Sequence, residues 1–123
     1  MPLVKRFEDL RAWQATRKLV SEVYALTREE PFARDYGLSD QIQRAAVSAM
    51  TNVAEGFDCE SRAEFARFLG YARRSIVEVQ SLLYTAKDVG YIDEATFDHL
   101  YHQCTEAKRL VGALLHSLRR RSS

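Results

Sequence analysis

Residues that break regular structure are rare in this sequence. Two prolines and five glycines occur among 123 residues, and Pro31 is the only proline beyond position 2. Because proline and glycine mark most turns, long uninterrupted elements are expected between them. No stretch alternates apolar and polar residues over the length of a strand, so a β-sheet is not expected. The sequence therefore favours an all-α fold.

Cysteine is also rare, and long apolar runs are missing. Cys59 and Cys104 lie far apart and form neither a Cys-x-x-Cys pair nor a metal-ligand spacing. Unpaired cysteines are typical of a reducing compartment, and we expect a cytoplasmic protein. No apolar run approaches the ~20 residues that cross a bilayer, and the first residues lack the apolar segment of a secretory signal. No membrane partner is expected.

The overall charge has no strong sign. The chain has 18 Lys and Arg against 17 Asp and Glu, which leaves a net charge of +1. A nearly neutral chain has no general attraction to nucleic acid, so any basic contact surface must be local. Apolar residues make up 46% of the sequence. This is ordinary for a single globular domain, which we assign to residues 1–123.

Apolar residues recur at helical spacing in four segments. The expected helices cover about residues 9–28, 39–56, 61–89 and 94–120. Several boundaries carry capping residues, with Ser39, Ser61 and Asp93 as N-caps and Gly90 as a C-cap. Gly56 is expected near the end of the second helix. Four helices with short connections predict an antiparallel up-down four-helix bundle.

A second apolar pattern lies on the outer face of the third helix. Small and apolar residues recur there every seven positions, and we call them the heptad stripe: Ala63, Gly70, Val77 and Tyr84. Isolated apolar residues on a surface are normal. A strict repeat is more typical of a second packing face, so we expect the bundle to assemble with copies of itself through this stripe.

The second helix carries a matching line of polar groups beside its alanine-rich inner face. These residues, the polar stripe, are Gln41, Arg44, Ser48, Asn52 and Glu55. One interpretation is a solvated helix face. The mixture of amides, a hydroxyl and an opposite-charge pair instead favours a hydrogen-bonded network at a helix or subunit junction. Contact with a ligand is a lesser alternative.

Patterns typical of catalysis or metal binding are weak. His99, His102 and Glu106 have ligand-like spacing, but helical geometry places them opposite the apolar stripe and toward solvent. Cys104 falls within the apolar stripe, and Cys59 has no histidine near it in sequence to activate it. There is neither a glycine-rich phosphate loop nor a nucleophile elbow. We expect no cofactor, no small-molecule substrate and no enzymatic activity.

Basic residues form two small clusters within the expected helices, and Lys5 and Arg6 precede the first helix. The clusters are Arg73 and Arg74 in the third helix, and Arg119, Arg120 and Arg121 at the end of the fourth. Arginines at a helix C-terminus are favourable through the helix dipole alone. In an oligomer each cluster would be repeated, so contact with phosphate groups is an open alternative.

The sequence also resembles a known family over nearly its whole length, from Phe7 to about Leu118. The most specific blocks are Gln41-Ile42-Gln43-Arg44-Ala45-Ala46 and Asn52-Val53-Ala54-Glu55-Gly56. Further matching residues are Phe7-Glu8-Asp9-Leu10, Trp13-Gln14, Tyr36-Gly37-Leu38, Ser61, Glu64-Phe65 and Gly90-Tyr91. The chain resembles the four-helix-bundle proteins encoded by intervening sequences within bacterial 23S ribosomal RNA genes. It is similar also to the accessory bundle protein of diversity-generating retroelements.

The resemblance implies a closed bundle that assembles as a ring-like homopentamer. It also implies a link to ribosomal RNA or to a ribonucleoprotein. The chain departs from the family where Cys59 replaces a common arginine and Arg74 replaces a common glycine, which moves basic charge from a loop to the third helix. Two functions follow as hypotheses: an oligomeric bundle that binds RNA, or a protein-binding scaffold or accessory subunit without nucleic-acid contact.

Overall fold

Four long helices make up nearly all of the protein. The computed structural model describes residues 4–122, with side chains through Arg120. The helices are α1 (Arg11–Thr27), α2 (Tyr36–Asp58), α3 (Arg62–Asp88) and α4 (Glu94–Ser122), and short 3-10 turns occupy Phe7–Asp9 and Phe32–Arg34. No strand occurs within residues 4–122, which confirms the predicted all-α class. Within the same range, none of the helices combines the length and apolar character needed to cross a membrane.

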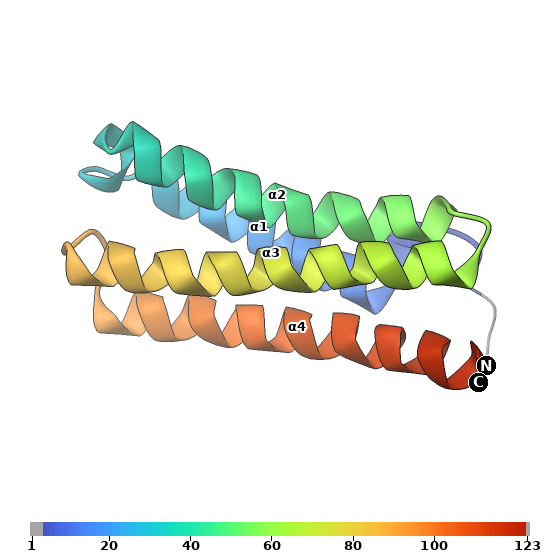
Figure 1. The fold of residues 1–123 in the computed structure, drawn as a ribbon. Helices are drawn as coiled ribbons and strands as arrows, with labels where there is room; N and C mark the ends of the chain where they lie inside the picture. Colours follow the sequence, from blue (N-terminus) through green and yellow to red (C-terminus); the bar gives the residue numbers. More distant parts are fainter. Residues whose placement is uncertain (1–3, 123) are drawn as a thin grey trace.

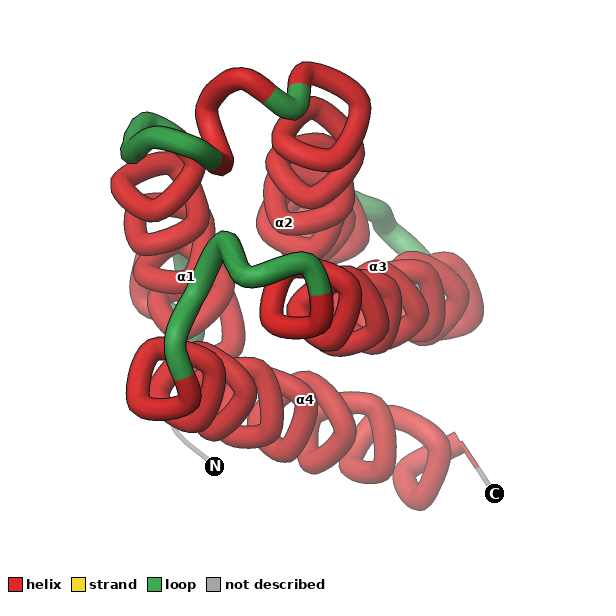
Figure 2. Tube along the Cα trace, turned by 90° about the vertical axis from the view of Figure 1, so that its left-hand side faces the viewer, coloured by secondary structure: helices red, strands yellow, loops and turns green. Residues whose placement is uncertain are grey.

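The helices lie side by side around a shared core (Figure 1). Each helix packs mainly against two neighbours, in the closed order α1, α2, α3, α4 and back to α1. The end view in Figure 2 shows the α1–α2 and α3–α4 connections at the near end and the α2–α3 connection at the far end. The core contains fully buried side chains from all four helices, namely Leu19, Val23, Ile42, Val53, Leu69, Ile76, Leu83 and Val111.

Local signals in the sequence located both ends of α3 and the start of α4 correctly. The Ser61 hydroxyl accepts a hydrogen bond from the Glu64 backbone N–H at 3.0 Å, and the Asp93 carboxylate accepts one from the Thr96 N–H at 2.8 Å. Gly90 adopts φ +85, and the N–H of Tyr91 donates to the Ala86 carbonyl at 2.9 Å. This is the Schellman arrangement expected of a glycine C-cap.

The predicted start of α2 was wrong. The N-cap is Asp35 rather than Ser39, since the Asp35 carboxylate accepts from the Leu38 N–H at 3.0 Å. Ser39 is buried inside the helix. The other oxygen of Asp35 accepts a 2.9 Å hydrogen bond from the Tyr91 hydroxyl in the α3–α4 connection. This bond to the Asp35 carboxylate raises the pKa of Tyr91, because the protonated hydroxyl is the donor. A tertiary contact therefore supports this helix start.

Gly56 has a packing role in addition to its expected place near the end of the second helix. Helix α2 ends at Asp58, two residues beyond Gly56. Gly56 is instead buried where α2 meets α3: a Cβ atom there would lie 2.7 Å from Phe68 Cβ and 3.0 Å from Phe65 Cδ1. The buried face of α2 is otherwise built largely from alanines, Ala45, Ala46 and Ala49. Small side chains let the two helix backbones approach closely.

The buried face of α1 includes a polar residue. Helix α1 begins at Arg11, after a 3-10 turn at Phe7–Asp9, and so two residues later than expected. Its fully buried positions include Thr16, whose hydroxyl donates to the Ala12 carbonyl at 3.1 Å. An intrahelical hydrogen bond satisfies the threonine hydroxyl, which is why a polar residue is tolerated there.

We predict that Gly56→Ala destabilises the protein although alanine is the better helix former. The new methyl group has no space beside Phe68. Overpacking should lower the free energy of unfolding by about 1–3 kcal/mol, which exceeds the gain of up to about 1 kcal/mol from the higher helix propensity of alanine. Urea unfolding followed by circular dichroism measures the difference.

Gly112→Ala is the matched control for this prediction. Gly112 also lies within a long helix, but nothing lies within 4 Å of a Cβ atom built there. This variant should gain about 0.5–1 kcal/mol. If both variants shift the urea midpoint in the same direction, the close approach of α2 and α3 at Gly56 does not distinguish the two glycines.

Candidate nucleic-acid interface

A groove between α3 and the C-terminal half of α4 brings together both predicted basic clusters. It has a volume of about 390 Å³ and is lined by Gly70, Arg73, Arg74, Val77, Leu115 and Arg119. We call it the arginine groove. Gly70, Val77 and Leu115 contribute its uncharged surface. The groove therefore combines two sets that the sequence analysis treated separately, the heptad stripe and the basic residues.

The arginines of this groove differ in their pairing from several other surface arginines. Arg44 pairs with Asp40 at 3.1 Å, Arg67 with Glu64 at 2.6 Å, and Arg109 with Glu106 at 2.6 Å. By contrast, among the residues whose side chains are described, no carboxylate lies within ion-pair distance of Arg73, Arg74 or Arg119. Arg120 directly follows Arg119 and is exposed, and the side chain of Arg121 lies outside the described residues. Three cations thus remain available to an external anion.

The fold also separates charge along the bundle. When each helix is divided at its midpoint, one half contains residues 20–46 and 76–107, with four Lys and Arg against eleven Asp and Glu. The other half contains residues 4–19, 47–75 and 108–122, with fourteen Lys and Arg against six Asp and Glu. All residues that line the arginine groove except Val77 belong to this basic half. A chain of nearly zero net charge therefore presents one strongly basic end.

The polar stripe lies mainly along the junction of α2 and α3. Ser48 accepts hydrogen bonds from Asn52 Nδ2 at 3.0 Å and from the Ser75 hydroxyl at 2.9 Å. Gln41 Nε2 donates to Glu78 at 3.3 Å. Ser48, Asn52 and Ser75 are partly buried. The remaining stripe members, Arg44 and Glu55, are exposed.

The heptad stripe is exposed over most of its length. Ala63 is exposed, Val77 retains 47% of its surface, and Gly70 faces open space. Tyr84 is exposed to a similar extent, at 48%, but its ring also packs on two α4 aromatics, Phe97 at 4.8 Å and Tyr101 at 5.7 Å between ring centres. One end of the stripe thus contributes to packing within the subunit while still reaching solvent.

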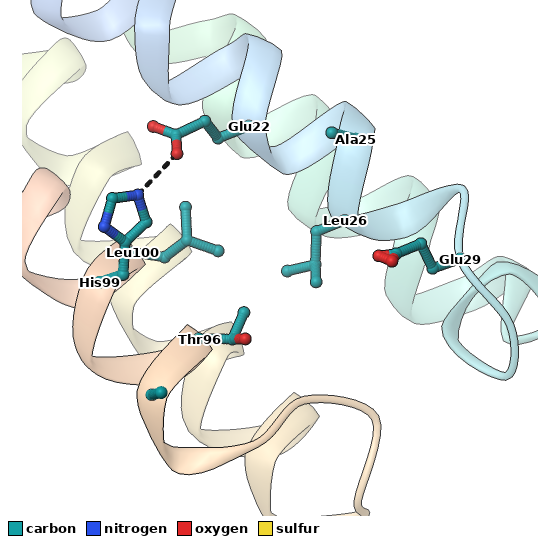
Figure 3. A pocket seen from close by; sticks show the side chains of 8 residues that line it. Glu22, Ala25, Leu26, Glu29, Thr96, His99 and Leu100 are labelled. Atoms are coloured by element: carbon teal, nitrogen blue, oxygen red, sulfur yellow. Dashed lines mark hydrogen bonds and ion pairs between the residues drawn. The ribbon is translucent and has the colours of Figure 1, made fainter.

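A second pocket lies at the acidic end, between α1 and the start of α4 (Figure 3). It has a volume of about 360 Å³, with Leu26 and Leu100 among its apolar lining residues. Glu22 and Glu29 belong to its wall, and Glu22 Oε1 lies 2.7 Å from His99 Nε2. Two carboxylates would repel phosphate, so this pocket is unsuited to nucleic acid.

The three residues with metal-like spacing are divided among different contacts. His99 pairs with Glu22 of α1, and Glu106 pairs with Arg109 of its own helix. No three His, Cys, Asp or Glu side chains gather as a metal site among the described residues. The Glu22–His99 pair was missed by the sequence analysis because the two residues are 77 positions apart and belong to different helices.

The cysteines lie in contrasting environments. Cys104 is fully buried in the core, and burial raises the pKa of its thiol to about 12. Cys59 is half-buried at the end of α2, where its thiol donates to the Glu55 carbonyl at 3.4 Å. A thiol that stays protonated in the core is chemically inert, because the thiolate is the reactive form.

The match to known proteins covers most of this architecture. Residues 8–113, from the turn before α1 into the second half of α4, match the 23S rRNA-intervening sequence protein family. The chain belongs to this family. The arginine groove lies largely within the matched region, since only Leu115 and Arg119 fall beyond it. No curated protein matches the sequence.

A solved structure supports the same fold. The chain is similar to a protein of unknown function from the S23 ribosomal protein family of Bacteroides thetaiotaomicron, with a TM-score of 0.79 and 19% identity. The superposition covers 85% of this chain and 95% of the other. At this identity the likeness establishes the helical architecture only.

We predict that the two thiols differ sharply in reactivity. At about pH 8, Ellman's reagent should label one thiol per chain quickly in the native protein and two after denaturation. Cys59→Ser should remove the fast phase. Rapid labelling of native Cys59→Ser would mean that Cys104 is accessible, contrary to its burial.

Proposed function

We propose that this protein is a non-enzymatic RNA-binding bundle of the bacterial cytoplasm. In this proposal the arginine groove contacts the phosphate backbone of ribosomal RNA or of a ribonucleoprotein. The antiparallel up-down bundles assemble through the heptad stripe into a ring-like homo-oligomer, for which we expect five subunits. The name of the family points to ribosomal RNA, and the surface of the bundle supplies the chemistry.

The observation that carries the proposal is the set of unpaired arginines at one end of the molecule. Arg73, Arg74 and Arg119 converge on one groove from two helices. Guanidinium groups bind phosphate oxygens through two parallel hydrogen bonds, and a free guanidinium gives up no internal ion pair to do so. The surrounding half of the bundle carries an excess of positive charge, which would steer RNA toward this end.

Assembly into an oligomer would increase the affinity for RNA. Gly70 and Val77 belong both to the heptad stripe and to the arginine groove. A contact through the stripe would therefore place arginines of each subunit along the junction. Every additional subunit would bring another set, and binding through several sets raises the apparent affinity without any new kind of contact.

The RNA proposal makes a quantitative prediction about salt. Each phosphate contact adds about 0.7–0.9 to the slope of log affinity against log salt concentration. Arg74→Gln and Arg119→Gln should each weaken binding to purified 23S ribosomal RNA and reduce this slope by about that amount. Fluorescence anisotropy over a salt series measures both effects.

Arg44→Gln is the control for this experiment. Arg44 is an equally exposed arginine, but it pairs with Asp40 and lies in the acidic half. The Arg44→Gln variant should bind RNA with the affinity and salt dependence of the unaltered protein. If the three variants lose affinity equally, the effect is one of general charge and the arginine groove is not the contact surface.

The assembly proposal is tested at Val77. Val77→Glu places a carboxylate on the exposed stripe, where it would be desolvated in a contact between subunits. Light scattering after size exclusion should show a lower mass, while circular dichroism stays unchanged. Val89→Glu is the matched control, because Val89 is another exposed valine and lies off the stripe. An unchanged mass for Val77→Glu would place the subunit contact elsewhere.

A protein-binding scaffold is the second candidate function. The uncovered apolar residues of the heptad stripe favour it, because an exposed apolar strip suits a protein partner as well as another copy. The two functions differ in their response to salt. If the protein does not bind ribosomal RNA at low salt but remains an oligomer, the result would favour the scaffold.

A further inference from the structure

An exposed tyrosine lies between two arginines on α3, outside the arginine groove. Tyr71 retains 37% of its surface although its ring contacts Phe68, with ring centres 5.9 Å apart. The Arg67 guanidinium lies 5.8 Å from the centre of the Tyr71 ring. Arg67 is in turn held by Glu64 at 2.6 Å. The aromatic ring is therefore fixed in orientation by neighbours and still open to solvent.

Helical geometry aligns Tyr71 with Arg74. Residues three and four positions apart are neighbours on a helix surface, so Arg67, Tyr71 and Arg74 form a single line along α3. The line is about 10 Å long, which is the length of roughly three stacked nucleotides. At one end Arg67 is neutralised by Glu64, whereas Arg74 has no acidic partner among the described side chains. One cation holds the ring, and the other is free to bind phosphate.

The Tyr71 ring lies to one side of the heptad stripe. Successive residues on a helix differ by about 100°, so Tyr71 points roughly at right angles to Gly70 of the stripe. It lies on the side of α3 that faces α2, where Ser75 bonds to Ser48. Arg74, by contrast, lines the arginine groove together with Gly70 and Val77.

We propose that this surface binds single-stranded RNA, with one base stacked on Tyr71 and a neighbouring phosphate on Arg74. The inference rests on the proposed RNA-binding function and specifies its substrate class. A tyrosine ring can stack on a base only if the face of that base is free. In a duplex the base faces are covered by neighbouring pairs, so a duplex engages the arginines but not the ring. The protein should therefore prefer an unpaired strand.

The test compares two forms of one RNA with the full-length protein. A labelled, unstructured RNA is titrated alone and after annealing to its complement, by fluorescence anisotropy at fixed low salt. Tyr71→Leu keeps an apolar side chain against Phe68 but has no aromatic face. It should weaken single-strand binding about ten-fold or more and leave duplex binding unchanged. Tyr71→Phe, which keeps the aromatic face, should bind both forms like the unaltered protein.

Two further variants separate stacking from other causes. Tyr36→Leu removes a tyrosine that is 80% exposed in the acidic half, and it should change neither affinity. Arg74→Gln should weaken both forms, because each presents phosphates. Thermal melting followed by circular dichroism shows whether Tyr71→Leu is folded, and the unchanged duplex affinity provides a second check.

The outcomes distinguish this inference from the function on which it rests. Equal affinity of the unaltered protein for the two forms, or full single-strand affinity in Tyr71→Leu, would refute base stacking while RNA binding stands. Failure of the unaltered protein to bind either form would overturn the proposed function and the stacking site together. Equal losses of affinity for the single strand and the duplex in Tyr71→Leu would also refute base stacking, since a stacking contact is lost from the single strand alone.

Discussion

Helices α2 and α3 approach closely at Gly56, where α2 has no side chain. Gly56 meets Phe65 and Phe68 at distances that exclude a methyl group, and the buried face of α2 also includes Ala45, Ala46 and Ala49. Dense packing of this kind holds the two helices in one relative position, because protein interiors have little free volume in which a helix could shift. The same approach brings Ser48 within hydrogen-bond distance of Ser75. It thus fixes the rotation of α3 about its own axis.

The rotation of α3 decides which of its residues reach solvent. Leu69, Ala72, Ile76 and Val79 occupy the core, so Arg73 and Arg74 must point outward, as does Val77. Helix α4 then contributes Arg119 to the same groove. Because the helices are joined end to end by short turns, basic residues from distant parts of the sequence collect in one half of the bundle. An almost neutral protein acquires a basic surface in this way, and that surface is the basis of the proposed function.

Features that depend on contacts between residues close in the sequence were easier to predict than features that depend on contacts between distant residues. The caps at Ser61 and Asp93 join residues three positions apart, and both were identified from the sequence. The start of α2 is an exception, because its cap from Asp35 to Leu38 is just as local, yet Ser39 was taken as the N-cap. The contact of Asp35 with Tyr91, 56 positions away, leaves no local pattern. Gly56 was expected near the end of α2, but its packing against α3 was not predicted. Its neighbours Phe65 and Phe68 belong to the next helix, so the close contact leaves no local pattern.

The sequence by itself determined the all-α class, the approximate extents of four helices, the buried cysteine and the family. Each of these depends on periodicity or on short motifs, and helical periodicity is a property of the local chain. Only the tertiary structure decided that the two arginine clusters share a groove with Gly70 and Val77, and that Glu22 pairs with His99. Net charge says nothing about where charges lie. Their separation into an acidic and a basic half arises only when the helices are packed side by side.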